Sequence, residues 1–145
     1  PQPHWDTIIN YDPDILLLMG DNVYGDCEDD NSCQNLVQAY RHFINHPSVQ
    51  GAAPRLSVFA TLDNHDYGEK LANRDNPHKD FAIELFQQAF GLNGLLPHQD
   101  GVYQSRIWGQ QPGKRVQVIL LDTRYARSPF LRPNAPAFTP VPAND

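Results

Sequence analysis

The sequence has little positive charge and no long apolar segment. It carries 11 lysine and arginine residues against 17 aspartate and glutamate residues, a formal net charge of −6. A chain of this sign offers no basic surface to a nucleic-acid backbone. No stretch approaches the roughly 20 apolar residues of a membrane-spanning helix, and no charged start with an apolar segment marks a signal peptide. We therefore expect neither sequence-specific nucleic-acid binding nor a transmembrane segment in this chain.

Cysteine is also scarce, because the chain has only two. Cys27 and Cys33 lie six positions apart in an acidic loop, close enough to pair and equally able to remain free thiols. A zinc site would need two more ligands at suitable spacing, and none is near in the sequence. The sequence leaves the choice between a disulfide and two thiols open.

What the sequence does contain is enough for one globular region. It has 145 residues, of which 40% are hydrophobic, so that it can bury a core. Five prolines fall within residues 129–145, which we expect to form an extended surface segment. Both ends look cut, so we expect that further parts of the domain, and any targeting segment, lie beyond them.

Short apolar runs alternate with helical patterns along the chain. We expect strands at 15–19, 56–60, 102–108 and 115–122, and helices at 3–10, 32–45 and 78–90. The first strand is a continuous apolar run, typical of a parallel strand that is covered on both faces. The first two strands and the helix between them predict a right-handed βαβ unit. The last two strands are joined by GQQPG, which favours a hairpin-type link.

The two longer helices carry boundary signals and apolar stripes. The helix at 32–45 has candidate capping residues in Asp30, Asn31 and Ser32, and Pro47 lies just past its end. The helix at 78–90 ends before Gly91, a typical stop residue. Its predicted buried stripe consists of Phe81, Leu85, Phe86, Ala89 and Phe90.

Polar clusters follow three of the predicted strands. They read GDNVYGD at 20–26, LDNHDYG at 62–68 and DTRY at 122–125. In open parallel α/β sheets, ligands bind where the carboxyl ends of strands and their loops converge. We expect the three clusters to meet at such an edge, although GD or NHD alone also fits an ordinary turn.

Together the clusters resemble a known family. Gly20-Asp21 and Asn64-His65-Asp66 match the GD and GNH[D/E] blocks of the calcineurin-like metallophosphoesterases. The longer segments GDNVYGD, ATLDNHDYG and VQVILLDTRY resemble successive blocks of the PhoD-like (alkaline phosphatase D) family. The resemblance covers the chain from Pro1 to about Pro129. Leu62 and Asn64 stand where the PhoD-like block usually has Trp and Asp, and the Asn agrees with the broader superfamily.

The resemblance implies a fold and a reaction. The fold would be an α/β sandwich of mixed sheets flanked by helices, and residues 1–145 would be the N-terminal part of the catalytic domain. The reaction would be hydrolysis of phosphate mono- or diesters by a metal-bound hydroxide at a dinuclear centre. The missing blocks at both ends imply that the isolated chain binds metal weakly and hydrolyses little. PhoD-like proteins are commonly exported, which implies a periplasmic or secreted location.

The same resemblance implies a set of metal ligands. Asp21 would bridge two metal ions, Tyr24 would be a phenolate ligand of a ferric ion, and Asn64 would bind the second metal. Two metals close together lower the pKa of a bound water and hold the phosphoryl group in line with it. Fe(III) and Ca(II) are favoured by the resemblance, and oxygen-rich ligation suits such hard cations; zinc, manganese and magnesium are further candidates.

Three more residues are carried over as catalytic or substrate-binding groups. His65 would stand by the leaving group or the phosphoryl oxygens, oriented by Asp66, because an imidazole can protonate a departing alkoxide and a carboxylate can select its tautomer. Arg124 would contact the phosphate. The alternative to an enzyme is a non-catalytic metal- or phosphate-binding protein with a degenerate site.

The remaining polar residues are expected to have ordinary structural roles. The acidic run at 26–30 does not have EF-hand spacing, which indicates a solvated loop. Lys79 is expected to face solvent, Tyr67 to be a half-buried aromatic, Asp63 to support its loop and Asp122 to anchor Arg124. Surface or helix positions are expected for the other histidines: His4, His42, His46, His78 and His98.

Overall fold

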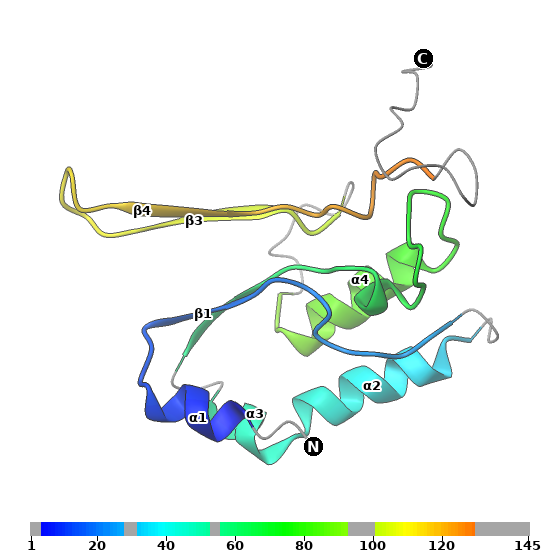
Figure 1. Ribbon diagram of the computed structural model, residues 1–145, viewed down its shortest axis with the longest axis horizontal. Coiled ribbons are helices and arrows are strands. Elements are labelled where there is room, and N and C mark those ends of the chain that lie inside the picture. Colours follow the sequence, from blue (N-terminus) through cyan, green and yellow to red (C-terminus); the bar gives the residue numbers. More distant parts are fainter. Residues whose placement is uncertain (1–3, 28–31, 53–55, 93–100, 130–145) are drawn as a thin grey trace.

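The structure is a computed structural model that describes residues 4–27, 32–52, 56–92 and 101–129. The chain has a mixed α/β fold. Its helices are α1 (His4–Asn10), α2 (Gln34–Ile44), α3 (Pro47–Ala52) and α4 (Lys79–Ala89), with a 3-10 turn, η1, at His65–Tyr67. Its strands are β1 (Ile15–Leu18), β2 (Ser57–Ala60), β3 (Gln104–Trp108) and β4 (Val116–Leu120). Figure 1 shows the β3–β4 hairpin along one side of the molecule and α1, α2 and α3 along the opposite side, with β1 between them.

The predicted βαβ arrangement is confirmed. β1 and β2 pair in parallel, in a register that matches Ile15 with Ser57 and Leu18 with Ala60. The connection contains α2 and also α3, a helix that the sequence pattern did not predict. Pro47 begins α3, at the first helical position, where its missing N–H costs no hydrogen bond. The handedness of the crossover stays a prediction.

The predicted hairpin-type link between the last two strands is confirmed. β4 pairs antiparallel with β3, and the described strands form two separate two-stranded sheets. The short connection at 109–115 explains this, because a parallel neighbour would need a crossover of a dozen or more residues. The hairpin is nevertheless joined to β2, since the Gln104 side chain donates a hydrogen bond to the carbonyl of Ala60 at 2.6 Å.

The first strand is less covered than its apolar run indicated. Leu16 and Leu18 pack against the core, whereas Leu17 is 40% exposed and Met19, just after the strand, is 75% exposed. Successive side chains of a strand point to opposite faces. Among the described residues, therefore, one face of β1 packs partly buried against the core, and the other is more exposed.

The core lies between the strands and the helices, and aromatic rings occupy much of it. Phe43 of α2 packs edge-on against Trp5 and also contacts Phe90, at centroid distances of 5.9 and 5.6 Å. Phe86 of α4 is fully buried, but Phe81 is 38% exposed, so its place in the predicted stripe is wrong. α4 ends before Gly91, whose φ of +65° agrees with the predicted stop.

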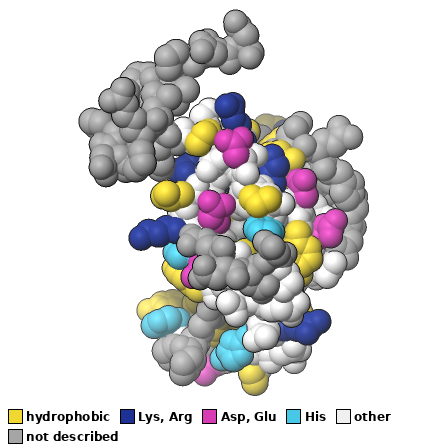
Figure 2. Space-filling view, turned by 90° about the vertical axis from the view of Figure 1, so that its right-hand side faces the viewer, with side chains coloured by type: hydrophobic (Ala, Val, Ile, Leu, Met, Phe, Trp, Pro, Cys, Tyr) yellow, Lys and Arg dark blue, Asp and Glu magenta, His cyan; other side chains and the backbone are white. Residues whose placement is uncertain are grey.

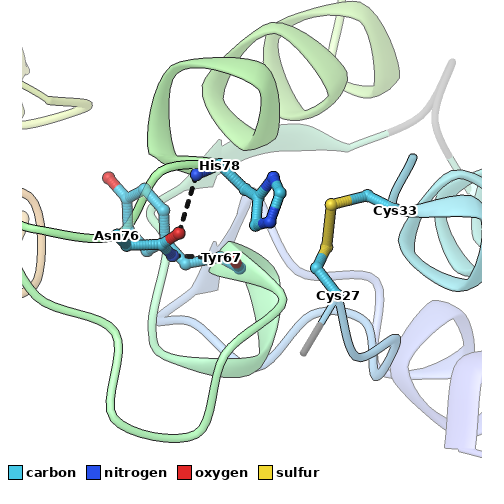
Figure 3. Close-up of a disulfide and its surroundings, with 5 residues drawn as sticks. All are labelled: Cys27, Cys33, Tyr67, Asn76 and His78. Carbon is cyan, nitrogen blue, oxygen red and sulfur yellow. Dashed lines mark hydrogen bonds between the residues drawn. A yellow bond between two sulfur atoms is a disulfide. The ribbon is translucent and has the colours of Figure 1, made fainter. Parts of the chain in front are cut away.

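Cys27 and Cys33 form a disulfide, which decides between the two alternatives (Figure 3). Both are buried, and the Cys27 amide donates to the Gly68 carbonyl at 2.7 Å. Gly68 has a φ of +72°, and a Cβ there would collide with the Cys27 sulfur. The disulfide is thereby held against the residue that follows η1. Figure 3 also shows the His78 ring turned toward it.

The start of α2 differs from the predicted cap. Cys33 is the N-cap residue, with a φ of +50°, and its side chain makes no capping hydrogen bond because its sulfur is in the disulfide. Asp30 and Asn31 lie outside the described residues, as does the proline-rich segment from position 130 onward.

One face of the molecule carries side chains of both charge signs (Figure 2). Figure 2 shows one face, on which acidic, basic and histidine side chains are interspersed without a broad area of one charge sign. Within the described residues, no helix has the length and apolarity to cross a membrane.

Phe86→Ala tests the core. Truncation of a fully buried phenylalanine typically lowers the free energy of unfolding by about 3–5 kcal/mol, because it loses apolar contacts and leaves a cavity. Phe81→Ala is the matched control on the same helix, with an expected loss below about 1.5 kcal/mol. Urea unfolding followed by circular dichroism measures both. Equal losses would contradict the described packing of α4.

Candidate functional site

The carboxyl ends of β1, β2 and β4 are joined by hydrogen bonds of Thr61. Its amide donates to the Leu18 carbonyl at 2.9 Å and its hydroxyl to the Leu121 carbonyl at 3.0 Å. The Asn22 side chain donates in turn to the Thr61 carbonyl at 2.8 Å. The three polar clusters therefore meet, as predicted, although β4 belongs to a different sheet.

Gly20 permits the first two clusters to touch. It has a φ of +105°, and a Cβ there would lie only 2.5 Å from the Asp63 side chain. Only glycine combines this backbone conformation with so close an approach. Asp21 follows with a φ of +50°, so the chain turns sharply directly after β1. The turn directs the Asp21 carboxylate toward η1, where its Oδ1 lies 3.4 Å from the His65 amide nitrogen as a hydrogen-bond acceptor.

Asp21, Tyr24 and His65 form one contact group. The Tyr24 hydroxyl donates to Asp21 Oδ2 at 3.4 Å, and the Tyr24 and His65 rings lie 4.4 Å apart with an interplanar angle of 36°. The neighbouring Asp21 carboxylate is the largest cause of a raised pKa of the Tyr24 hydroxyl, because it disfavours a phenolate. Tyr24 is 66% exposed, so its ring is accessible from solvent.

Asn64 and Arg124 form a second contact group. Arg124 Nε is paired with the Asp63 carboxylate, and Arg124 Nη2 donates to Asn64 Oδ1 at 3.3 Å. The side chains of Arg124 and Asp63 are 20% and 31% exposed. Asp63 thus supports its loop, as expected, by binding the arginine of the third cluster.

Asp66 bonds to the backbone of two clusters. It is fully buried, and its oxygens accept hydrogen bonds from the amides of Asn22, Val23 and Asp63 at 2.9, 3.2 and 2.9 Å. Burial raises the pKa of Asp66 to about 6, and the backbone hydrogen bonds oppose part of this rise. The carboxylate therefore positions the loops that carry the candidate ligands, and its bonds go to these amides instead of to the His65 ring.

Asp122 anchors Arg124 through the backbone. Asp122 Oδ1 accepts hydrogen bonds from the amides of Arg124 and Tyr125, both at 2.9 Å. Asp122 Oδ2 accepts the Tyr67 hydroxyl at 2.5 Å. Tyr67 is 1% exposed, so the expectation of a half-buried ring is wrong. Burial, with the nearby Asp122 carboxylate, raises the pKa of Tyr67 and keeps it a hydrogen-bond donor.

Lys79 is partly exposed, and its ammonium also makes contacts within the chain. Its ammonium donates to the Arg74 carbonyl at 2.8 Å and lies 4.3 Å from the centre of the Tyr125 ring. The Tyr125 hydroxyl donates to Asp80 at 3.2 Å. These contacts connect the start of α4 to the segment that carries Arg124.

The candidate metal ligands are few in the described part of the chain. No group of three or more His, Cys, Asp or Glu side chains is arranged there to hold a metal ion. The oxygens of Asp21 and Tyr24 are adjacent, and Asn64 adds a neutral amide oxygen that already accepts a bond from Arg124. This donor set, with a single carboxylate, fits part of the coordination of a hard cation.

Two histidines that were not among the predicted site residues share a cavity with the site. His42 and His46 line a cavity of about 840 Å³ together with Tyr24 and His65. The signal was available in HFINH at 42–46, where two histidines stand four positions apart, one in the last turn of α2 and one just beyond its end. Of the other expectations, His4 is exposed as predicted, and His98 lies outside the described residues.

Comparisons of the chain with protein-family models, curated proteins and solved structures give no match.

Asp66→Asn is expected to destabilise the site without removing volume. The amide can still accept the bonds from Asn22 and Val23, but its NH₂ group would face the Asp63 amide, leaving two buried donors opposed. The expected loss is about 1–3 kcal/mol in the free energy of unfolding. Asp75→Asn, at an exposed position, should change it by less than about 0.5 kcal/mol. Similar losses in the two variants would contradict the role of Asp66.

The stability of the chain should also carry a pH signature of Asp66. The pKa of this carboxyl is about 6 in the folded chain and has its ordinary value of 3.8 when unfolded, so the folded state binds the proton more tightly. The tighter proton binding by the folded state raises the free energy of unfolding below pH 4, and this stabilisation is lost as the pH rises through 6. Urea unfolding between pH 4 and 7, with a chelator present, should show this decline in the wild type and a weaker one in Asp66→Asn. Parallel pH profiles would refute the assignment.

Proposed function

We propose that the chain is the N-terminal part of a calcineurin-like metallophosphoesterase domain similar to the PhoD-like family. The complete protein would hydrolyse phosphate mono- or diesters with the help of two or more metal ions. The mixed α/β fold is compatible with the sandwich of that family. An exported location is part of the proposal, and the buried disulfide supports it, because such bonds persist in oxidising compartments.

The observation that carries the proposal is the meeting of three motif segments. Asp21 lies within hydrogen-bond reach of the His65 backbone, 44 positions away, and Arg124 contacts Asn64, 60 positions away. These residues come from the three segments that resemble the family's blocks. A chance resemblance in loops would not require the same residues to lie at one place in the fold.

The donor chemistry fits a partly assembled metal centre. Asp21, Tyr24 and Asn64 would hold the metal ions, with Asp21 in the bridging position because a carboxylate has two oxygens. Bound metal ions would lower the pKa of a water and offset charge on the phosphoryl oxygens. Ferric iron and calcium suit these oxygen donors best, and zinc, manganese and magnesium are further candidates. The other ligands would come from outside this chain.

Arg124 is proposed to bind the phosphoryl group. Its contacts with Asp63 and Asn64 use two of the five N–H groups of a guanidinium, which leaves capacity for oxygens of an anion. The pairing with Asp63 holds the planar group in one orientation. Arg124 would therefore orient the phosphoester beside Asn64.

His65 is proposed to donate a proton to the leaving alkoxide. The contact of its ring with Tyr24 limits its rotation, and its backbone amide is tied to Asp21. An imidazole can carry out this transfer near neutral pH. Asp66 contributes by positioning the backbone on both sides of the site.

A non-catalytic metal- or phosphate-binding protein is the second candidate. The contact between Arg124 and Asn64 favours it, because a guanidinium beside the amide oxygen opposes a metal ion at the same oxygen. A binding protein would retain metal or phosphate without turnover.

Asp21→Asn in the complete protein tests the proposal. Loss of a bridging carboxylate should lower both turnover and bound metal by about 100-fold or more. Turnover is measured with p-nitrophenyl phosphate after loading with iron and calcium, and metal content by mass spectrometry. Asn64→Ala should have the same two effects.

Asp14→Asn is the matched control, because Asp14 is exposed just before β1 and outside the site. It should leave turnover and metal content unchanged. A fully active Asp21→Asn protein would refute the proposed function, and metal binding without turnover in the wild type would favour the second candidate.

A further inference from the structure

A large cavity adjoins the candidate site and is not used by the chemistry described so far. It has a volume of about 840 Å³ and lies between the segment at 22–26 and α2. Tyr24 and His65, which are in ring contact with each other, form part of its lining. Clefts of this size commonly bind organic ligands. A group attached to a phosphate held beside His65 would therefore have room to enter it.

The α2 side of the cavity carries hydrogen-bonding side chains. His42 and His46 lie four positions apart, with ring centres 6.2 Å apart and an interplanar angle of 72°. Asn35 and Gln38 add amide groups to the same lining. The side chains of α2, with His46 just beyond its end, thus provide several donors and acceptors close together.

His46 has an incomplete set of hydrogen bonds. Its Nδ1 atom is buried and has no partner among the residues that the structure describes. Most buried polar atoms in folded proteins are hydrogen-bonded, so each exception calls for an explanation. Because this atom is shielded from solvent, a ligand in the open cavity would bond to the accessible side of the His46 ring instead of to Nδ1.

We propose that this cavity binds the alcohol part of the phosphoester and that His42 and His46 hydrogen-bond to it. The inference rests on the proposed function and adds a substrate class to it. That class is a phosphate ester of a neutral, hydroxyl-bearing organic group about the size of a nucleoside or a sugar.

The lining argues for this class. The polar residues of α2 are interspersed with Val23, Ala39 and Phe43, a mixture that suits a group with both hydroxyls and apolar surface. Asp26 also lines the cavity, and its carboxylate disfavours a second anionic group. A small alkyl or aryl ester would leave the histidines unused.

The test compares two substrates on the complete, metal-loaded protein. AMP carries a neutral nucleoside with hydroxyls, whereas p-nitrophenyl phosphate carries a small aryl group without them. In His42→Ala combined with His46→Ala, kcat/KM for AMP should fall about tenfold or more, chiefly through KM, because two hydrogen bonds are lost. For p-nitrophenyl phosphate it should change less than twofold.

Two further variants separate binding from folding. His46→Gln keeps a hydrogen-bonding side chain and should recover part of the loss, and His4→Ala, outside the cavity, should behave as wild type. If the wild type hydrolyses both esters but the double substitution lowers kcat/KM for both by the same factor, the inference is wrong. The proposed function stands in that case.

A binding experiment distinguishes failure of the function from failure of the cavity assignment. If the wild type hydrolyses neither ester, the proposed function fails. The cavity is then tested by titrating AMP into the protein and following the histidine ring signals by NMR. Shifts at His42 and His46 without shifts at His4 would support a nucleoside site in the cavity. Unchanged signals of His42 and His46 would overturn it.

Discussion

The buried carboxylate of Asp66 is the interaction on which the arrangement of the site depends. It accepts amide hydrogen bonds from Asn22 and Val23 in one loop and from Asp63 in another. A carboxylate removed from water is stable only when its oxygens are well bonded. Since both loops must supply donors, neither can move without the other. Asp21 and Asn64, one residue away from these donors, keep their spacing through this shared partner.

A second set of bonds attaches the third cluster to the same assembly. Thr61 connects the carboxyl ends of β1, β2 and β4. The Asp122 carboxylate accepts hydrogen bonds both from the buried hydroxyl of Tyr67 and from the Arg124 amide. The guanidinium of Arg124 is paired with Asp63 and not with Asp21. The Asp21 carboxylate thereby remains available to a cation, which is the property that the proposed metal centre requires.

Much of this could be predicted from local patterns. Apolar runs and helical spacing predicted the strands and the longer helices with ends within two residues, because these signals arise within one segment. The partners of Asp66 and Arg124 could not be predicted in the same way. The Asp66 carboxylate could equally have faced the adjacent His65, and only the folded backbone brings the amides of positions 22 and 23 to it. Likewise Phe81 fitted the apolar period of α4, but the orientation of the helix leaves it exposed.

The disulfide has a consequence for how the chain is produced. Its sulfurs are enclosed under Gly68 once the turn after η1 has formed, and the exposed fractions of Cys27 and Cys33 are 2% and 0%. An oxidant can reach the two thiols only while this region is open. The timing of oxidation relative to compaction therefore governs the yield of correctly bonded chain. Expression hosts that oxidise thiols during synthesis suit this protein better than oxidation in air after purification.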